Sequence, residues 1–389
     1  MTTRNPAERL TEEQVLLRDA VRELARDRIA PRAAEIDRTS TFPEDIRQLL
    51  ASQDVLGLPF PVEHGGVGGD LLTVCIAIEE IARACATSSL ILIVQELGSL
   101  PLLIAGSAEQ QARFFPDLAS GRILAAFGLT EPEAGSDAAS VRTRAVRDGD
   151  DYVLDGTKRF ITNGSVAGII TVFAVTDPDA PRHRRLSCFV VEVPTEGFRV
   201  ERLEHKLGIR GSPTAELSFA GVRVPVANRI GAEGDGFSIA MATLDRSRPG
   251  VAAQAIGIAQ GALDTAVAYA RDRRQFGQRI GDFQMVASML ADMDAGIEAA
   301  RQLLYTACVE IESGGPDVAR WSAMCKLIAG DTAMRVTTDA VQVLGGYGYI
   351  DEFPVERMMR DAKITQIYEG TQQVQRLVIA RALLGRPEA

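Results

Sequence analysis

Cysteine is scarce in this chain of 389 residues, and the five thiols lie far apart. Their number is odd and no Cys-x-x-Cys pair occurs, so the sequence offers neither a disulfide framework nor a zinc site. We therefore expect reduced thiols in the core of a cytoplasmic protein. The five positions are Cys75, Cys85, Cys188, Cys308 and Cys325.

Several catalytic signatures are also absent. The three histidines, at 64, 183 and 205, include no pair at metal-ligand spacing. There is no Gly-x-Ser-x-Gly elbow and no Walker loop. The glycine run at 65–69 follows no strand, so it fails as a dinucleotide fingerprint. The sequence predicts no metal site.

Positive charge is in deficit, with 42 basic and 52 acidic residues, a formal net charge of -10 and a pI of about 5.1. This balance excludes broad affinity for nucleic acid or anionic membrane, but not a local basic pocket for a phosphorylated ligand. A long uncharged apolar run is missing too. The most lipophilic stretch, 71–94, contains Glu79, Glu80 and Arg83, which predicts a buried helix and no membrane span. The N-terminal residues have no signal-peptide pattern.

The length predicts two or three domains. In residues 1–122, capping boxes begin helices at Thr11 with Gln14 and at Ser107 with Gln110. Pro43 begins another, which we expect to run through residue 50. The sequence therefore predicts an α-helical N-terminal domain.

Short runs rich in β-branched and aromatic residues follow in 123–231, separated by turn signals. They predict a small β-barrel or sandwich, with strands at 141–146, 152–154, 169–175, 188–193 and 215–219.

Helical periodicity returns in 232–389, where apolar residues step by three and four. The strongest stretches, 249–269, 283–311 and 318–344, predict a C-terminal bundle of four or more helices. The fold class is thus α+β and multidomain, in the order helices, strands, helices.

The segment 360–376 places a carboxylate at a predicted helix junction. Gly370 is suited to a left-handed helix exit, and Thr371 can cap the next helix. Burial beside apolar residues would raise the basicity of Glu369, which suits a base that removes a proton from carbon. The alternative is a solvated glutamate in an ordinary helix-turn-helix.

The residues Ile367-Tyr368-Glu369-Gly370-Thr371 resemble the catalytic segment of the acyl-CoA dehydrogenases of short- and medium-chain type, and the order of domains is also that of this family. The resemblance implies that Glu369 removes the α-proton of an acyl-CoA, with Tyr368 and Gly370 beside the substrate. It further implies an FAD cofactor, a trans-2-enoyl-CoA product, an electron-transfer flavoprotein as acceptor, and a homo-oligomer, usually a tetramer.

Two further segments resemble flavin-binding motifs of the family. Residues 127–137 would contact FAD through Phe127, Leu129 and Thr130, and Ser136 would lie by both FAD and acyl-CoA; a plain interdomain loop is the alternative. Residues 160–164 match the second motif, in which Phe160, Ile161 and Thr162 would bind FAD. Many members have tryptophan in place of Phe160; phenylalanine keeps the aromatic face but has no indole N–H.

Residues 244–249 resemble the start of a family helix at the substrate cleft. Asp245 and Arg248 would bind the CoA part of the substrate, and Arg248 is suited to the anionic groups of CoA. A subgroup of the family carries its catalytic glutamate at the position of Ser247, so Ser247 with Glu369 indicates the commoner group. The alternative is a salt bridge at a helix N-terminus.

The remaining resemblance concerns FAD contacts across a subunit boundary. Taken alone, 271–277 would be a basic helix end complementing the helix dipole, and 342–346 a helix stop. The family match assigns FAD contacts to Arg273, Phe276, Gln284, Gln342, Gly345, Gly346, Thr371 and Gln373.

Two rivals stay open at this point. One is the same fold with oxidase or monooxygenase chemistry, and the other is a non-enzymatic, DNA-associated relative, which the charge of -10 disfavours. Acyl chain length is not fixed; residues 90–94 are candidates for the floor of the pocket.

Overall fold

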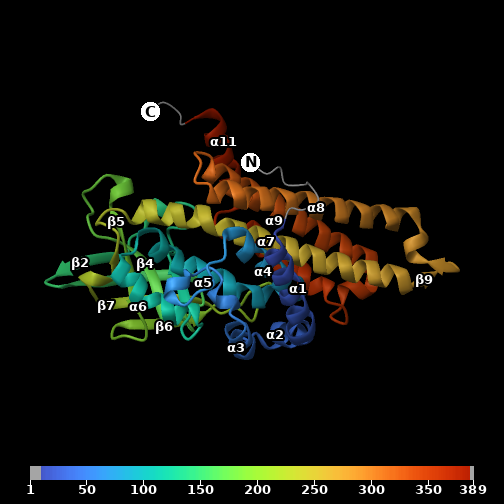
Figure 1. Ribbon diagram of the computed structural model, residues 1–389, viewed down its shortest axis with the longest axis horizontal. Coiled ribbons are helices and arrows are strands. Elements are labelled where there is room, and N and C mark those ends of the chain that lie inside the picture. Colours follow the sequence, from blue (N-terminus) through green and yellow to red (C-terminus); the bar gives the residue numbers. More distant parts are fainter. Residues whose placement is uncertain (1–9, 386–389) are drawn as a thin grey trace.

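The computed structural model describes residues 10–385, and its elements fall into the predicted order of helices, a sheet and then long helices (Figure 1). Residues 1–9 and 386–389 lie outside the described residues. The predicted N-terminal and C-terminal domains therefore each include a few residues that the structure does not describe, as does the N-terminal stretch predicted to have no signal-peptide pattern.

The N-terminal part is helical. Both predicted capping boxes are present, at Thr11 with Gln14 and at Ser107 with Gln110. A short helix that the sequence reading missed, α2, lies between the first two predicted helices. The helices are α1 (Glu12–Leu24, continued by a π-helical turn Ala25–Ile29), α2 (Ala33–Thr39), α3 (Glu44–Ser52), α4 (Leu71–Ala84), α5 (Ala86–Ala105) and α6 (Ala108–Ala119).

The lipophilic stretch 71–94 is buried as predicted, but it is not one helix. Cys85 has extended backbone angles (φ -158, ψ 110) and separates α4 from α5. Within residues 10–385, two helices are long and apolar enough to cross a membrane, α5 and α7 (Gly236–Asp272). Their most apolar windows are 78% and 72% buried inside the protein, which is typical of core helices.

The middle part is one sheet of eight strands. Its path runs β6-β7-β3-β2-β4-β5-β8, and β1 pairs in parallel with β4. Three strands, β1, β6 and β8, were not predicted. The bounds predicted for β4 are confirmed, whereas β2, β3, β5 and β7 are longer than or shifted from their predicted bounds. The strands are β1 (Ala125–Gly128), β2 (Arg144–Asp148), β3 (Asp151–Thr162), β4 (Ile169–Val175), β5 (Leu186–Glu192), β6 (Phe198–Leu203), β7 (Thr214–Pro225) and β8 (Arg229–Ile230).

The sheet curls around its own apolar core. Tyr152 on β3 and Phe189 on β5 have ring centroids 4.9 Å apart, although β2 and β4 lie between these strands in the sheet order. The other face packs on the helices, through Phe173 of β4 together with Phe115 of α6. Every residue of β4 is buried, which explains why its sequence is apolar apart from Thr171.

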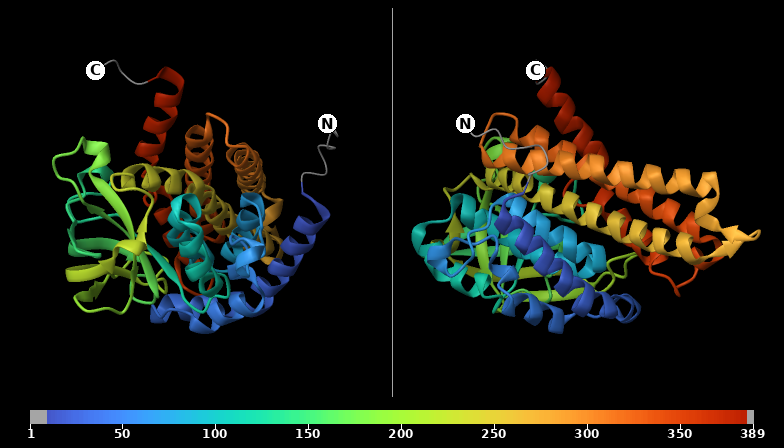
Figure 2. Two further views of the ribbon diagram at one scale, coloured as in Figure 1. Left: turned by 60° about the vertical axis from the view of Figure 1, so that its left-hand side comes forward. Right: turned by 45° about the vertical axis from the view of Figure 1, so that its right-hand side comes forward.

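The C-terminal part is built on three long helices that lie side by side, with shorter ones at one flank (Figure 2). A small hairpin closes the far tip, and the last helix projects from the body. The elements are α7 (Gly236–Asp272), β9 (Arg274–Gln275), β10 (Gln278–Arg279), α8 (Gln284–Glu312), α9 (Val318–Leu344), α10 (Val355–Ala362) and α11 (Gln372–Leu384).

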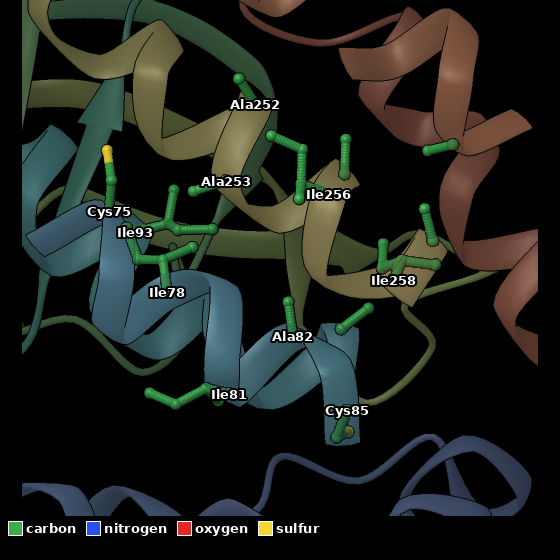
Figure 3. Close-up of a cluster of buried hydrophobic side chains, with 14 of the residues drawn as sticks. Cys75, Ile78, Ile81, Ala82, Cys85, Ile93, Ala252, Ala253, Ile256 and Ile258 are labelled. Carbon is green, nitrogen blue, oxygen red and sulfur yellow. The ribbon is translucent and has the colours of Figure 1, made fainter. Parts of the chain in front are cut away.

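Helix α7 joins the three parts, because one end packs near the sheet while its middle packs on α4 and α5. Figure 3 shows Ile78 and Ile93 of the N-terminal helices facing Ala253 of α7 in this shared core. The predicted helix start at 244–249 is wrong: α7 begins at Gly236, and Pro249 lies inside it.

Candidate active site

The turn that carries Glu369 connects α10 to α11. A 3-10 turn (Lys363–Gln366) ends the first helix, and Thr371 caps the second by accepting a hydrogen bond from the backbone N–H of Val374 at 3.3 Å. Gly370 has a φ of 92, as predicted, and Glu369 itself has a φ of 51. Two successive left-handed residues turn the chain sharply, and this conformation is unfavourable for a residue with a side chain.

Three side chains hold this strained turn by its carbonyl oxygens. Arg248 Nε donates to the oxygen of Glu369 at 3.1 Å, and Gln375 Nε2 donates to both carbonyls, at 3.2 and 2.8 Å. Lys326 Nζ donates to the oxygen of Gly370 at 2.8 Å. The catalytic candidate is therefore fixed from α7, α9 and α11 at once.

The Glu369 carboxylate accepts a hydrogen bond from Ser247 Oγ at 2.5 Å. Burial raises the pKa of Glu369, whereas Ser247 and the charges of Arg248 and Lys326 oppose that rise. The side chain still keeps some solvent access. The result is a carboxylate of increased basicity that a ligand can reach, which is what proton abstraction from carbon requires.

Asp245 and Arg248 form an ion pair at 2.7 Å beside this turn. Burial raises the pKa of Asp245, and Arg248 counteracts this. The pair lies well inside α7, so the alternative of a helix N-terminal salt bridge is wrong. Tyr368 donates its hydroxyl hydrogen to Gln254 Oε1, two turns further along α7.

The two candidate flavin segments meet beside each other at the sheet. The backbone N–H of Arg159 donates to the oxygen of Thr130 at 2.9 Å, and buried Lys158 donates to the oxygen of Leu129 at 3.2 Å. Lys158 also pairs with Glu131 at 2.7 Å. The structure thus brings Phe127, Leu129 and Thr130 together with Phe160, Ile161 and Thr162.

Phe160 presents an unusual surface in this group. Its ring is 55% exposed, its φ is 59, and the guanidinium of Arg159 lies 4.9 Å from the ring centroid. Phe160 lies inside β3 at a bulge in its pairing with β7, and a left-handed residue that holds an aromatic ring outward fits a planar ring ligand. Ile161, in contrast, is buried, so only its backbone can serve a ligand. Ser136 lies exposed in the loop after Thr130.

A third group of predicted residues lies at the far tip of the bundle. Arg273, Gly345 and Gly346 line a pocket of about 450 Å³, and the guanidinium of Arg273 lies 5.6 Å from the ring centroid of Tyr347. Phe276, Gln284 and Gln342 are exposed nearby in the chain, on the hairpin and the ends of α8 and α9. Gln373 is exposed on α11.

This tip is remote from Glu369 within one chain. Arg273 follows Arg248 by 25 residues along α7, which corresponds to about 37 Å of helix. The structure therefore places the predicted residues in three groups, and the tip pocket is far from Glu369 of the same chain.

Four residues of the site were not predicted: Lys326 and Gln375, which hold the turn, Gln254, which binds Tyr368, and Glu96, a buried carboxyl on α5 that acts electrostatically on Glu369. Glu96, Gln254 and Lys326 belong to helical stretches without a motif. Gln375 lies within the segment 360–376, but its hydrogen bonds to the turn were not predicted. For Glu96 and Lys326, the sequence signal that could have indicated a functional role is a charged residue at a core-facing position of an apolar helix.

Sequence models of acyl-CoA dehydrogenases match almost the whole chain. The N-terminal domain matches residues 11–122, the middle domain 126–222 and the C-terminal domain 234–384. A probable acyl-CoA dehydrogenase of Mycobacterium tuberculosis, FadE25, is 52% identical over 97% of this chain and 96% of its own.

Solved structures give the same result. Butyryl-CoA dehydrogenase from Megasphaera elsdenii superposes with a TM-score of 0.93 at 44% identity, covering 96% of this chain and 99% of its own. A chain in a structure reported for the electron transferring flavoprotein of Acidaminococcus fermentans gives a TM-score of 0.95 at 45% identity, covering 97% and 99%.

Proposed function

Because this chain belongs to the acyl-CoA dehydrogenase family of flavin-dependent oxidoreductases, we propose that it oxidises an acyl-CoA thioester to the trans-2-enoyl-CoA, with FAD as cofactor and an electron-transfer flavoprotein as acceptor. The observation that carries the proposal is Glu369, a carboxylate of raised pKa in a rigid left-handed turn.

Glu369 is the base for the α-proton. Ser247 orients its carboxylate, and the bonds from Arg248, Lys326 and Gln375 fix the backbone that carries it. Such positioning lowers the entropy cost of bringing a base to a weakly acidic C–H bond. The backbone N–H of Glu369 is the proposed donor to the thioester oxygen, where negative charge develops.

The flavin would lie against the segments of Thr130 and Phe160. The exposed Phe160 ring and the adjoining backbone edge at Ile161 and Thr162 fit a planar ring with a polar edge. When bound there, FAD would accept hydrogen from the β-carbon as hydride. The chain's own contribution is the geometry that places the α-carbon between this face and Glu369.

We further propose a short or compact acyl group. Tyr368 next to the base bonds to Gln254, whose amide donates to the oxygen of Ala86 and to Ser89 Oγ, at 3.0 and 3.1 Å. This bridge of buried side chains between α7 and α5 would limit the depth of the acyl pocket. The likeness to butyryl-CoA dehydrogenase supports the same substrate class.

Assembly and location belong to this proposal too. The tip pocket around Arg273 lacks a partner site within reach in its own chain, so we propose that it binds the FAD of a neighbouring subunit in a homotetramer. All five cysteines are buried free thiols, which is consistent with a cytoplasmic location.

Replacing Glu369 by Gln tests the base directly. The amide keeps the shape but does not accept the proton, so flavin reduction by acyl-CoA should slow by at least about a hundredfold. Stopped-flow bleaching of the flavin measures this, and bound flavin in the variant is the control. Flavin reduction at the wild-type rate would show that another residue is the base.

A panel of straight and branched acyl-CoAs with an artificial acceptor tests the substrate class. Butyryl-CoA should reduce the flavin much faster than a long-chain acyl-CoA. Reoxidation is then compared in air and with an electron-transfer flavoprotein. Fast reoxidation in air would indicate oxidase chemistry, and DNA retention without flavin reduction would indicate a non-enzymatic relative.

A further inference from the structure

Lysine is rare in this protein: the chain has four lysines among its 42 basic residues. One of them, Lys326 on α9, is wholly buried, with an exposed fraction of 0%. Within residues 10–385 no carboxylate forms an ion pair with Lys326, and its two hydrogen bonds go to neutral oxygens. A buried unpaired ammonium is unfavourable, so its presence needs a compensating interaction.

The neutral oxygens belong to the turn that carries the base. Lys326 Nζ donates to the oxygen of Gly370 at 2.8 Å and to Gln372 Oε1 at 3.3 Å. The next turn of the same helix binds the same segment, since Gln372 Nε2 donates to the oxygen of Leu327 at 2.8 Å and to Asp331 Oδ1 at 3.0 Å. One face of α9 therefore holds the backbone immediately after Glu369.

Helix α9 packs closely against this segment at Gly330. A Cβ on Gly330 would lie 3.0 Å from Gln372 Nε2 and 3.2 Å from the oxygen of Thr365. Because the turn is in an unfavourable conformation at Glu369, it persists only where surrounding contacts fix it. The ammonium of Lys326 donates to the Gly370 carbonyl, and Arg248 donates to the adjoining carbonyl of Glu369.

The charge of Lys326 also acts on Glu369. The anions that act on the ammonium are Glu369 first and then Asp331, while Arg248 opposes them. Burial lowers the pKa of Lys326 to about 8, so it carries its charge through the neutral range. In the other direction, Lys326 lowers the proton affinity of Glu369, which burial raises.

Other polar and titratable side chains also act on Glu369. Ser247 and Arg248 on α7 favour its ionised form. Tyr368 has its pKa raised by burial, and Glu96 on α5 is a like charge only when it is ionised. Arg248 is already neutralised by Asp245 at 2.7 Å, whereas Lys326 has no such partner.

We propose that Lys326 is a positioning residue of the dehydrogenation: its ammonium fixes the catalytic turn through the Gly370 carbonyl and keeps Glu369 ionised at neutral pH. The inference rests on the proposed role of Glu369 as the base. Of the anions that act on the buried lysine, Glu369 acts most strongly, and proton transfer from substrate removes that negative charge.

The test compares Lys326→Met, Lys326→Gln and Lys326→Arg as holoenzymes. Flavin reduction by butyryl-CoA is followed by stopped flow across pH. Removing the charge should move the lower half-point of the pH profile up by about one unit in both the Met and Gln variants, since an opposite charge nearby shifts a carboxyl by this order. Lys326→Arg should keep the half-point. Gln, which can still donate to Gly370, should retain more of the limiting rate than Met.

Lys363→Met is the matched control, because it removes an exposed lysine six residues before Glu369 in the chain. Its half-point should stay within about 0.2 units of wild type, as expected for a solvent-screened charge. A lowered rate with an unmoved half-point in Lys326→Met and Lys326→Gln would leave a purely structural role and overturn the proposal. Should the Met variant not fold, the Gln variant decides in the same way.

Infrared difference titration of the holoenzyme without substrate provides a readout independent of turnover. The protonated carboxyl band that Glu369→Gln removes should titrate at higher pH in Lys326→Gln than in wild type. An unchanged titration overturns the proposal. If no acyl-CoA reduces the wild-type flavin, the proposed function fails, yet this titration still shows whether Lys326 controls the charge of Glu369.

Discussion

Glu96 on α5 is a carboxyl with an unusual environment. It is 6% exposed and, among the residues from 10 to 385, has no hydrogen-bond partner that the structure records. Burial raises its pKa to about 8; Arg246 lowers it, and Glu369 and Glu312 raise it further. Glu96 is therefore neutral at pH 7, which avoids a second negative charge behind the base.

Its protonation makes stability depend on pH. The folded chain holds the Glu96 proton up to about pH 8, whereas the unfolded chain releases it near 4.5. Folding takes up a proton between these limits, so this group makes the protein less stable as pH rises. Glu96→Gln does not titrate, so its stability relative to wild type should increase by up to about 5 kcal/mol as pH rises from 4.5 to 8, at about 1.4 kcal/mol per unit.

Urea unfolding at a series of pH values measures this difference. Glu63→Gln, which changes an exposed glutamate, is the control and should leave the slope unaltered. A constant difference between Glu96→Gln and wild type across the pH range would show that the folded chain ionises Glu96 normally.

The role proposed for Glu369 rests on a local sequence motif formed by its neighbours. Its contacts with residues distant in the chain were not predicted. Ser247 lies 122 residues away in the chain and Lys326 lies 44 residues from the Gly370 carbonyl that it binds. The left-handed conformation was predicted at Gly370, where glycine makes it favourable, and missed at Glu369, where tertiary bonds impose it.

At the scale of elements, α4 and α7 cross at very short distance because α7 has glycines at the crossing. A Cβ on Gly257 would lie 2.2 Å from the oxygen of Glu79, and one on Gly261 would lie 2.4 Å from the oxygen of Arg83. These are backbone atoms of α4 and do not rotate away. The two helices could not approach this closely with any other residue at 257.

Gly257→Ala should therefore destabilise the protein. Helix propensity favours alanine by about 1 kcal/mol, but overpacking of a rigid core costs about 1 to 3 kcal/mol, and a clash with backbone belongs at the upper end. We expect a net loss, measured as a lower midpoint in thermal or urea unfolding.

Gly250→Ala on the same helix is the matched control. Its Cβ would meet Ile78 Cδ1 at 3.4 Å and Glu96 Oε2 at 3.7 Å, which are ordinary contacts. This variant should be as stable as wild type or slightly more stable. Equal losses in the two variants would contradict the argument from backbone contact.

Each element that the sequence patterns misplaced or missed has a physical explanation. Pro249 indicates a helix start, yet it lies inside α7, where close packing on both sides offsets one lost backbone bond. The break between α4 and α5 falls at Cys85, which is neither glycine nor proline, so no turn signal marks it. The strands β1 and β6 are short or exposed, and their residues show no clear alternation.

At the scale of the whole molecule, α7 runs from the turn that carries Glu369 to the tip pocket, where the predicted FAD contact Arg273 lies. Its Ser247 and Arg248 hold the catalytic turn, and Arg273 at its C-terminal end lines the tip pocket, about 37 Å away. A second copy of the chain in an opposed orientation would bring a tip pocket to each flavin.

Arg273→Ala should therefore weaken both FAD retention and thermal stability. A ligand that binds only the native assembly stabilises it by mass action, so losing contacts to FAD lowers the melting temperature most when FAD is limiting. FAD release on dilution and melting with and without added FAD measure the effect.

Arg279→Ala is the control at the same tip, since Arg279 pairs with Asp282 of its own chain at 2.8 Å. It should retain FAD as wild type does. Gel filtration that shows a flavin-loaded monomer would refute the assignment of the tip pocket to a neighbouring subunit.

The scarcity of lysine has a practical consequence for handling the protein. Lys158 and Lys326 are buried, which leaves Lys363 exposed and Lys206 partly exposed as lysine amines on the described surface. Both flank Arg360, which lies three residues before Lys363 and donates to the oxygen of Leu207, next to Lys206, at 3.1 Å. Amine-directed tethers that react with lysine side chains would then attach each chain through one small region, so molecules immobilised in this way would share one orientation.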